Sequence, residues 1–198
     1  MEITAEMVKS LRQKTGGGIM ECKRALKETD GDIEEAITFL RKKGLAKADK
    51  KSDRETGDGA IGSYIHSGNK IGVLAKVHCE TDFVANTPDF QQLVKDICMH
   101  IAAANPRFVS RDEVTEDVLN KEREIYAAVA RESGKPDKII EKIVTGKMDK
   151  FFEENCLLEQ RFVKDTDSTI QELIKQKIAV LGENITIGTF ARFEISRG

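Results

Sequence analysis

The chain has 198 residues, of which 39% are hydrophobic and 33% are charged, a composition that suits one globular domain or two small ones. Its formal net charge of −2 argues against a dedicated nucleic-acid-binding protein, because such proteins usually carry a strongly basic face. No stretch reaches the roughly 18 consecutive apolar residues of a membrane-spanning helix, and the N-terminus has no signal-peptide pattern. We therefore expect a cytoplasmic protein that binds neither nucleic acid nor a membrane.

The residues that usually carry chemistry are scattered along the chain. The sequence has no P-loop, no dinucleotide-binding glycine motif and no nucleophile elbow. The three histidines show no pattern that would activate a cysteine. We therefore expect no catalytic residue, no metal ligand, no cofactor and no nucleotide site. The four cysteines, which form no Cys-x-x-Cys pair and are expected to be reduced and mostly buried, are Cys22, Cys79, Cys98 and Cys156.

Residues 4–44 predict three short helices that pack as a small bundle. Gly16-Gly17-Gly18 interrupts the first helix, Asp32 caps the third, and Gly44 is expected to end it. The second helix has apolar residues at helical spacing: Ile19, Cys22 and Leu26.

Residues 46–59 carry dense charges of both signs and almost no apolar residue. This composition predicts a boundary, formed either by a solvated helical extension or by a linker. We therefore divide the chain into a three-helix module (1–45), a charged linker (46–59) and a core (60–198).

The core begins with a predicted β-hairpin. Two alternating runs, Ile61–His66 and Ile71–Cys79, flank the turn residues Ser67-Gly68-Asn69. Thr87-Pro88-Asp89 then begins a helix, because Thr is a good cap and Pro suits the first helical position. The segment Cys79–Asn86 is therefore an apex at the end of a strand, where proteins often place functional residues.

Asp82 and Phe83 stand next to each other at this apex. An exposed Phe at such a place would suit insertion into a partner's pocket. The alternative is that Phe83 packs beneath the following helix while Asp82 is a solvated turn residue. The local pattern alone favours this alternative.

The remainder of the chain predicts more helices than strands. After the helix that begins at Pro88, further helices are expected from about Glu116 and from Pro136, and these two form a hairpin or pack against the sheet. Cys156–Val163 predicts a strand or an extended segment, and Asp165–Ser168 predicts a turn that caps a short helix.

A well-marked strand closes the chain, with alternate residues of Ile185–Ile195 on one face. The predicted fold class is thus α+β. A three-helix module precedes an α+β core that contains a small antiparallel sheet and a helical hairpin.

Several segments resemble the signatures of one family, bacterial translation elongation factor Ts. The resemblance runs from end to end, and two long signatures in the expected order make it highly specific. Gly17 stands where the family usually has Ala, and Ile19 stands where it often has Met. The segments that carry the resemblance are Val8–Arg12, Thr15–Gly18, Cys22–Leu26, Gly31–Glu34, Glu80–Ala85, Leu157–Gln160 and Phe190–Glu194.

The resemblance implies a guanine-nucleotide exchange factor for elongation factor Tu, without catalytic chemistry of its own. It also implies that the N-terminal module has a ubiquitin-associated-like fold. The residues expected to intrude beside the partner's nucleotide site and dislodge its Mg²⁺ are Thr81, Asp82, Phe83 and Val84. Those expected on the N-terminal contact surface are Arg12, Ile19 and Met20.

The length of the chain suggests a homodimer. Longer members of the family that the chain resembles have two related core subdomains, and this chain has room for one. The resemblance implies that a second copy supplies the other half, through the core sheet or its helices. The edge of the strand Ile185–Ile195 is one plausible contact.

Three other functions remain as alternatives. The helical module could bind ubiquitin or acidic peptides, the Lys-rich linker could bind RNA, or a cysteine could act as a nucleophile. None of these alternatives accounts for the Thr81–Val84 signature.

Overall fold

The computed structural model describes residues 2–132, 134 and 136–195. It forms two compact units, each built from segments that are distant in the sequence. Both groups of predicted binding residues, at the apex and in the N-terminal helices, belong to the first unit. Among the described residues, the first unit contains 2–61, 76–94 and 172–186, and the second contains 62–75, 95–132, 134, 136–171 and 187–195.

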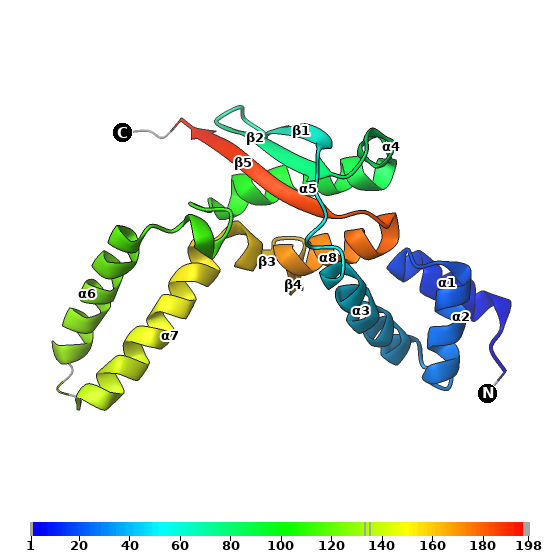
Figure 1. Ribbon diagram of the computed structural model, residues 1–198, viewed down its shortest axis with the longest axis horizontal. Coiled ribbons are helices and arrows are strands. Elements are labelled where there is room, and N and C mark those ends of the chain that lie inside the picture. The colour runs from blue at the N-terminus through cyan, green and yellow to red at the C-terminus, as the bar shows by residue number, and fades with distance from the viewer. Residues whose placement is uncertain (1, 133, 135, 196–198) are drawn as a thin grey trace. The chain divides into compact units, whose positions relative to one another are not determined.

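Three helices at the N-terminus enclose a small apolar core, as predicted (Figure 1). They are α1 (Ala5–Thr15), α2 (Ile19–Glu28) and α3 (Ile33–Asp49). The Asp32 carboxylate accepts a hydrogen bond from the Glu35 backbone at 2.8 Å, which confirms the predicted cap. The buried residues of this core are Val8, Leu11, Cys22, Ala25, Leu26 and Ala36.

The expectation that Gly44 ends the third helix was wrong, because α3 continues through Gly44 to Asp49. A β-carbon on Gly44 would lie 3.3 Å from the β-carbon of Ala179 in α8 (Ile170–Leu181). Gly44 therefore permits a close approach of two helices and does not mark a helix end. The Asp49 carboxylate pairs with the Lys175 ammonium at 2.6 Å farther along the same two helices.

Three strands form an antiparallel sheet in the order β1-β2-β5 (Figure 1). These are β1 (Asp58–Ile65), β2 (Ile71–Cys79) and β5 (Ile185–Glu194), which confirms the predicted hairpin and the closing strand. Alternate residues of the central strand β2 are buried on one face, as expected for a sheet covered on one side. These residues are Val73, Ala75, Val77 and Cys79.

The helix α5 (Pro88–Ala104) covers the buried face of the sheet. The Cys98 thiol is hydrogen-bonded to the backbone of Ala75 in β2, and the Arg192 guanidinium of β5 donates to the carbonyl of Ala102 at 3.2 Å. The helix starts as predicted, with the Thr87 hydroxyl accepting from the Phe90 backbone at 3.3 Å. Its fully buried stripe consists of Phe90, Leu93, Ile97 and Ile101.

The helices α6 (Glu116–Glu132) and α7 (Asp137–Asn155) lie side by side as an antiparallel hairpin, which decides between the two predicted arrangements (Figure 1). Short 3₁₀ turns at Arg111–Glu113 (η1) and Leu157–Glu159 (η2) lie beside the base of the hairpin. Its core is continuous with the chain around these turns. The buried members of that core are Val114, Met148, Phe151 and Cys156.

The segment before α8 differs from the prediction. Within the expected strand Cys156–Val163, only Arg161–Phe162 is a strand (β3). The expected turn at Asp165–Ser168 is instead part of β4 (Asp165–Thr169), which pairs antiparallel with β3. Asp, Thr and Ser favour turns by propensity, but here β3 provides backbone partners for them, and the turn falls at Val163-Lys164.

The predicted α+β fold class is therefore confirmed. Within the described ranges, no helix combines the length and apolarity needed to cross a membrane. The same residues contain no group of three or more His, Cys, Asp or Glu placed to hold a metal ion. All four cysteines are free and buried, as expected for reduced thiols.

Candidate partner-binding site

The apex begins where β2 ends at the buried residue Cys79. The Cys79 thiol donates to the carbonyl of Thr81 at 3.1 Å. One helical turn follows, α4 (Asp82–Ala85), in which Thr81 is the N-cap and its hydroxyl accepts from the Val84 backbone at 3.4 Å. Ala85, at the end of α4, is only 4% exposed. The two ends of the apex are thus held while its middle faces outward.

Phe83 is 82% exposed at this apex. The alternative that Phe83 packs beneath the following helix was therefore wrong. Thr81 and Ala85 turn inward on either side, so the helical turn directs the aromatic ring away from the core. Asp82 is also exposed, while Val84 is half-buried. A large aromatic side chain that is exposed on an ordered turn is available to insert into a pocket of another protein.

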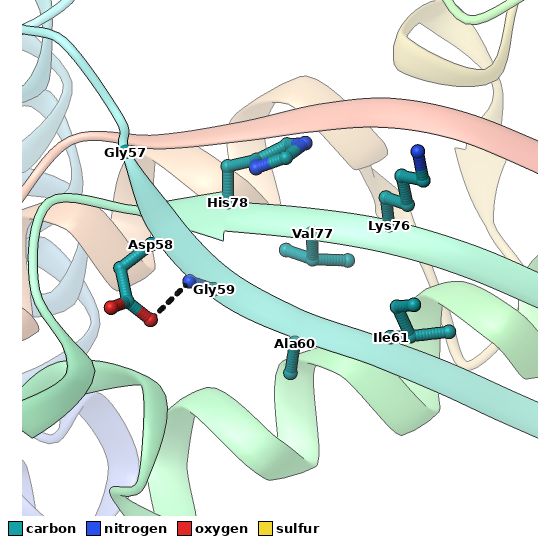
Figure 2. A pocket seen from close by; sticks show the side chains of 8 residues that line it. All are labelled: Gly57, Asp58, Gly59, Ala60, Ile61, Lys76, Val77 and His78. Carbon is teal, nitrogen blue, oxygen red and sulfur yellow. Dashed lines mark hydrogen bonds between the residues drawn. The ribbon is translucent and has the colours of Figure 1, made fainter.

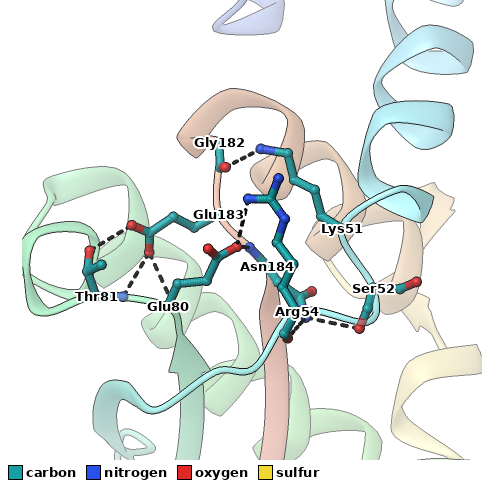
Figure 3. Close-up of polar contacts among 8 residues, drawn as sticks. All are labelled: Lys51, Ser52, Arg54, Glu80, Thr81, Gly182, Glu183 and Asn184. Atoms are coloured by element: carbon teal, nitrogen blue, oxygen red, sulfur yellow. Dashed lines mark hydrogen bonds and ion pairs between the residues drawn. The ribbon is translucent and has the colours of Figure 1, made fainter.

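The turn between α8 and β5 holds the apex from a distant part of the chain. The Glu183 carboxylate accepts from the backbone N–H of Glu80 at 3.1 Å and of Thr81 at 3.0 Å, both at Oε2. Its other oxygen accepts from the Thr81 hydroxyl at 2.6 Å. Figure 3 shows these bonds converging on one carboxylate. Because hydrogen bonds to a charged acceptor are among the stronger ones, this contact fixes the start of α4.

In a second set of hydrogen bonds, a residue of the turn donates and a residue of the apex accepts (Figure 3). The Glu80 carboxylate accepts from the Asn184 backbone at 2.6 Å and from the Arg54 guanidinium at 3.5 Å. The Asn184 side chain donates to the carbonyls of Ser52 at 3.1 Å and Arg54 at 2.8 Å. The turn therefore binds both the apex and the segment that leads from α3 to β1.

The cysteine thiols are poorly suited to nucleophilic chemistry. Burial and the nearby Glu183 carboxylate raise the pKa of Cys79. Burial raises the pKa of Cys98 and of Cys156 to about 11. These three thiols are therefore protonated near neutral pH, which disfavours the alternative of a cysteine nucleophile at these positions.

The predicted N-terminal contact residues lie on the surface of the helical module. Arg12 is exposed in the last turn of α1. Ile19 and Met20 begin α2 and are 57% and 76% exposed. Helical spacing had placed Ile19 with Cys22 and Leu26, but only the latter two are buried. Ile19 occupies the first turn, before the helix contacts the core, and is free to contact another molecule.

An open hollow of about 380 Å³ lies over the start of β1 and the end of β2 (Figure 2). Asp58, Lys76 and His78 contribute its ionisable side chains, and the rest of its lining is backbone and small or apolar side chains. The Asp58 carboxylate already accepts from the Gly59 backbone at 2.6 Å. The hollow is lined mainly by the two strands, and its Asp58 carboxylate is occupied by this hydrogen bond.

The family resemblance singled out the residues of the apex, but neither the resemblance nor the local pattern indicated the residues that hold it. Glu183 and Asn184 are about a hundred residues away from the apex in the chain, so local patterns contain no sign of the contact. The available signal was the polar triplet Gly182-Glu183-Asn184 between an apolar helix and an apolar strand. A buried Asn at a strand start, here 2% exposed, usually bonds to the backbone of another segment.

Comparison with known proteins gives matches along nearly the whole chain. The family model described as "Elongation factor TS" matches residues 2–197. The elongation factor Ts of Syntrophomonas wolfei subsp. wolfei is 60% identical over 196 residues, which cover 99% of this chain and 92% of that protein. The elongation factor Ts of Geobacter metallireducens is 58% identical over 198 residues, covering 100% and 92%.

A more distant relative matches over a similar extent. The elongation factor Ts of Thermosipho melanesiensis is 54% identical over 193 residues, which cover 98% of each chain. The matched region includes every element that builds the apex and the turn at Glu183.

Proposed function

Because the chain belongs to the elongation factor Ts family, we propose that it is a guanine-nucleotide exchange factor for elongation factor Tu. In this role it binds the GDP-bound GTPase, promotes release of GDP and allows GTP to bind. The observation that carries the mechanism is the 82% exposure of Phe83 on an ordered apex. A cytoplasmic location accords with a role in translation elongation.

The apex residues Thr81–Val84 would act as a wedge beside the nucleotide site of the partner. In GTPases, Mg²⁺ bridges phosphate oxygens to protein ligands and contributes much of the affinity for the nucleotide. An inserted aromatic ring can displace the side chains that position those ligands. Loss of Mg²⁺ would then leave the phosphates of GDP poorly neutralised, and GDP would dissociate faster.

Asp82 would assist from the position before Phe83. Its carboxylate is exposed and can accept from backbone donors that the wedge uncovers, or repel the phosphate charge. Thr81 has a structural part in this proposal, because its hydroxyl caps the turn that carries Asp82 and Phe83. Val84 is half-buried and belongs to the same turn.

Exchange by this route requires no nucleotide site on the factor itself. A factor that weakens GDP binding to its partner must itself bind less tightly when GDP is present, by the same ratio. Incoming GTP or GDP can therefore release the factor. The side chains of this chain need only contact the GTPase.

The N-terminal helices would supply a second contact. We propose that residues 1–45 form a ubiquitin-associated-like module, joined by the charged linker 46–59 to the partner-binding and dimerising core 60–198. Arg12, Ile19 and Met20 are each exposed, lie near the α1–α2 bend in the sequence and would add affinity. A Met20→Ala variant checks this in a nucleotide-release assay. If the concentration of this protein that gives half-maximal GDP release is the same for Met20→Ala and the native chain, the N-terminal module does not contribute to the contact through this residue.

The central test is release of a fluorescent GDP analogue from purified elongation factor Tu. The native chain should accelerate release, and Phe83→Ala should reduce the acceleration about 30-fold, since truncating a buried aromatic anchor typically costs ~2 kcal/mol or more. The matched control is Val129→Ala, which removes a 62% exposed apolar side chain from α6 and should leave the rate unchanged.

The other outcomes of this assay are equally informative. Equal acceleration by native and Phe83→Ala chains would keep the exchange function and reject the wedge. Absence of acceleration by the native chain would reject the exchange function. Thermal unfolding of each variant separates these results from loss of the fold, because Phe83 makes little contact with the core.

We also propose that the chain forms a homodimer through the sheet face that points away from α5. In the second unit, Ile65 of β1 lies against Gly72 of β2, where an added β-carbon would be 3.1 Å from the Ile65 side chain. Leu74 shares this face, because its neighbours Val73 and Ala75 point toward α5. Phe193 shares it because Arg192 points toward α5.

The exposure of these side chains supports the dimer. Ile65, Leu74 and Phe193 are 62%, 49% and 66% exposed. Soluble monomers rarely expose several large apolar side chains together on one sheet face. A two-fold axis would place this face against the same face of a second copy.

A further inference from the structure

We infer that Glu183, in the turn between α8 and β5, is a positioning residue that presents the Phe83 wedge to the partner by holding the Thr81 cap. This inference rests on the exchange function proposed above. It adds to that function a residue that lies outside the Thr81–Val84 signature and 102 residues from Thr81 in the chain.

Glu183 determines how the Thr81 hydroxyl is oriented. A carboxylate has no hydrogen to donate, so the Thr81 hydroxyl must donate its proton to Glu183 across the 2.6 Å contact. This leaves the lone pairs of the hydroxyl oxygen to accept the Val84 N–H at 3.4 Å. Glu183 therefore selects the rotamer and the proton direction that make Thr81 the cap of α4.

Glu183 also fixes the backbone that precedes α4. Its Oε2 accepts the N–H groups of Glu80 and Thr81. Two successive backbone donors and one side-chain donor thus bind the same carboxylate, just before Asp82. The direction in which the chain enters α4 depends on this one side chain.

Glu183 is itself held in place, because both of its neighbours in the chain are anchored. Gly182 has φ of 84°, which permits the sharp exit from α8, and its carbonyl accepts from the Lys51 ammonium. Asn184 is 2% exposed and is fixed by the carbonyls of Ser52 and Arg54 (Figure 3). The residues on both sides of Glu183 are therefore anchored to another segment, and the carboxylate is held in place.

The Phe83 ring has few contacts with its own chain. Its side chain is 82% exposed, so contacts of the ring with its own chain contribute little to its position. A single helical turn of four residues is not stable by itself. The position of the ring is then determined by the cap and by the burial of Ala85. Loss of the cap would leave Phe83 in several orientations, which must be restricted again on binding.

The experiment compares Glu183→Ala and Glu183→Gln in the GDP-release assay with elongation factor Tu. We expect Glu183→Ala to lower kcat/KM for exchange by about 10-fold or more, since bonds to a charged acceptor commonly contribute at least this factor. Glu183→Gln should lose less activity, about 3-fold, because its amide oxygen still accepts from the two N–H groups although the charge and the acceptor for the Thr81 hydroxyl are gone. The control Glu141→Ala, an exposed acid of α7, should have native kinetics.

A double-mutant cycle with Phe83→Ala distinguishes positioning from a general structural role. If Glu183 acts through Phe83, Glu183→Ala should cause less than about 2-fold further loss once the ring is absent. Multiplicative losses in the double variant would overturn the inference, as would native kinetics of Glu183→Ala.

A second pair of variants covers the case in which Glu183→Ala fails to fold. Thr81→Val removes only the hydroxyl at nearly constant shape, whereas Thr81→Ser keeps it. We expect Thr81→Val to lose exchange activity about 10-fold and Thr81→Ser to retain it, as for other N-cap residues. Equal activity of the two would overturn the inference. Failure of the native chain to accelerate GDP release would instead reject the proposed function itself.

Discussion

At the scale of single residues, the chain satisfies its buried polar groups by contacts between distant segments. His100 is fully buried, with Nε2 3.0 Å from the side-chain oxygen of Gln160 and Nδ1 accepting from the Val163 backbone at 3.4 Å. These two bonds require a neutral imidazole with its proton on Nε2. The Gln160 amide in turn donates to the carbonyl of Glu154 at 2.7 Å. The network joins α5, α7 and the segment before α8 without any charge.

Protonation of His100 should destabilise the protein at mildly acidic pH. Burial lowers the pKa of His100 in the folded chain, and the Gln160 bond only partly opposes this. As the pH falls, the unfolded chain therefore binds a proton at this histidine at a higher pH than the folded chain does. The stability that the neutral form provides is present above about pH 6.5 and decreases as the pH falls below that value. The expected slope is at most about 1.4 kcal/mol of unfolding free energy for each pH unit.

Urea unfolding at pH 8, 7, 6 and 5.5 measures this effect, with His100→Gln as the comparison. The variant should be less stable at pH 8, because it loses part of the network, but its stability should fall less between pH 7 and pH 5.5. Parallel pH profiles for the two chains would show that His100 is not the titrating group.

At the scale of secondary-structure elements, the start of the β1–β2 hairpin depends on one glycine. Gly59 has φ of +146°, and a β-carbon there would lie 2.2 Å from the carbonyl oxygen of Val77 and 2.7 Å from the α-carbon of His78. Both contacts are with backbone, which cannot move without separating the strands. Gly59→Ala should therefore destabilise the fold by about 2 kcal/mol or more, as substitutions that strain a special backbone position do.

Gly57→Ala provides the matched control, because a β-carbon on Gly57 would have no atom within 4 Å. We expect its unfolding free energy to lie within about 0.5 kcal/mol of the native value. Denaturant unfolding of the two variants under the same conditions makes the comparison. Similar stabilities would mean that the hairpin can open at this point at little cost.

Local sequence patterns predicted some of these elements correctly and others wrongly. Periodicity and turn residues identified the three N-terminal helices, the hairpin, α5 and β5, because each has a strong local pattern. They failed at Gly44 and at Asp165–Ser168, where a neighbouring helix or strand overrides a local preference. They also could not decide whether Phe83 is exposed, since that depends on which residues hold the apex.

The candidate site shows the same difference between local features and contacts with distant segments. The family resemblance singled out Asp82 and Phe83, whereas the local pattern alone favoured a Phe83 packed beneath the following helix. Glu183 was not singled out, because its role arises only when the turn after α8 meets the end of β2. Residues at an apex can thus be singled out from the sequence while the residues that position them are not.

At the scale of the whole molecule, the exposed sheet face raises the question of what covers it. β2 is the central strand of β1-β2-β5, so its outward side chain Leu74 lies in the middle of the apolar face with Ile65 and Phe193. If two such faces meet, each buried Leu or Phe side chain contributes roughly 1.5–3 kcal/mol of transfer free energy. A charge placed at Leu74 would have to be desolvated without a partner, which is more costly than the burial it replaces.

Light scattering coupled to gel filtration tests this dimer. The native chain should elute with twice the single-chain mass of 22.1 kDa, and Leu74→Glu should shift it to the single-chain mass at micromolar concentration. Val129→Glu, which places the same charge on an exposed apolar position of α6, should remain dimeric. A native mass of one chain would rule out the dimer. A dimer that tolerates Leu74→Glu would move the contact from this face to the edge of β5, where unpaired backbone groups are also available for a two-fold pairing.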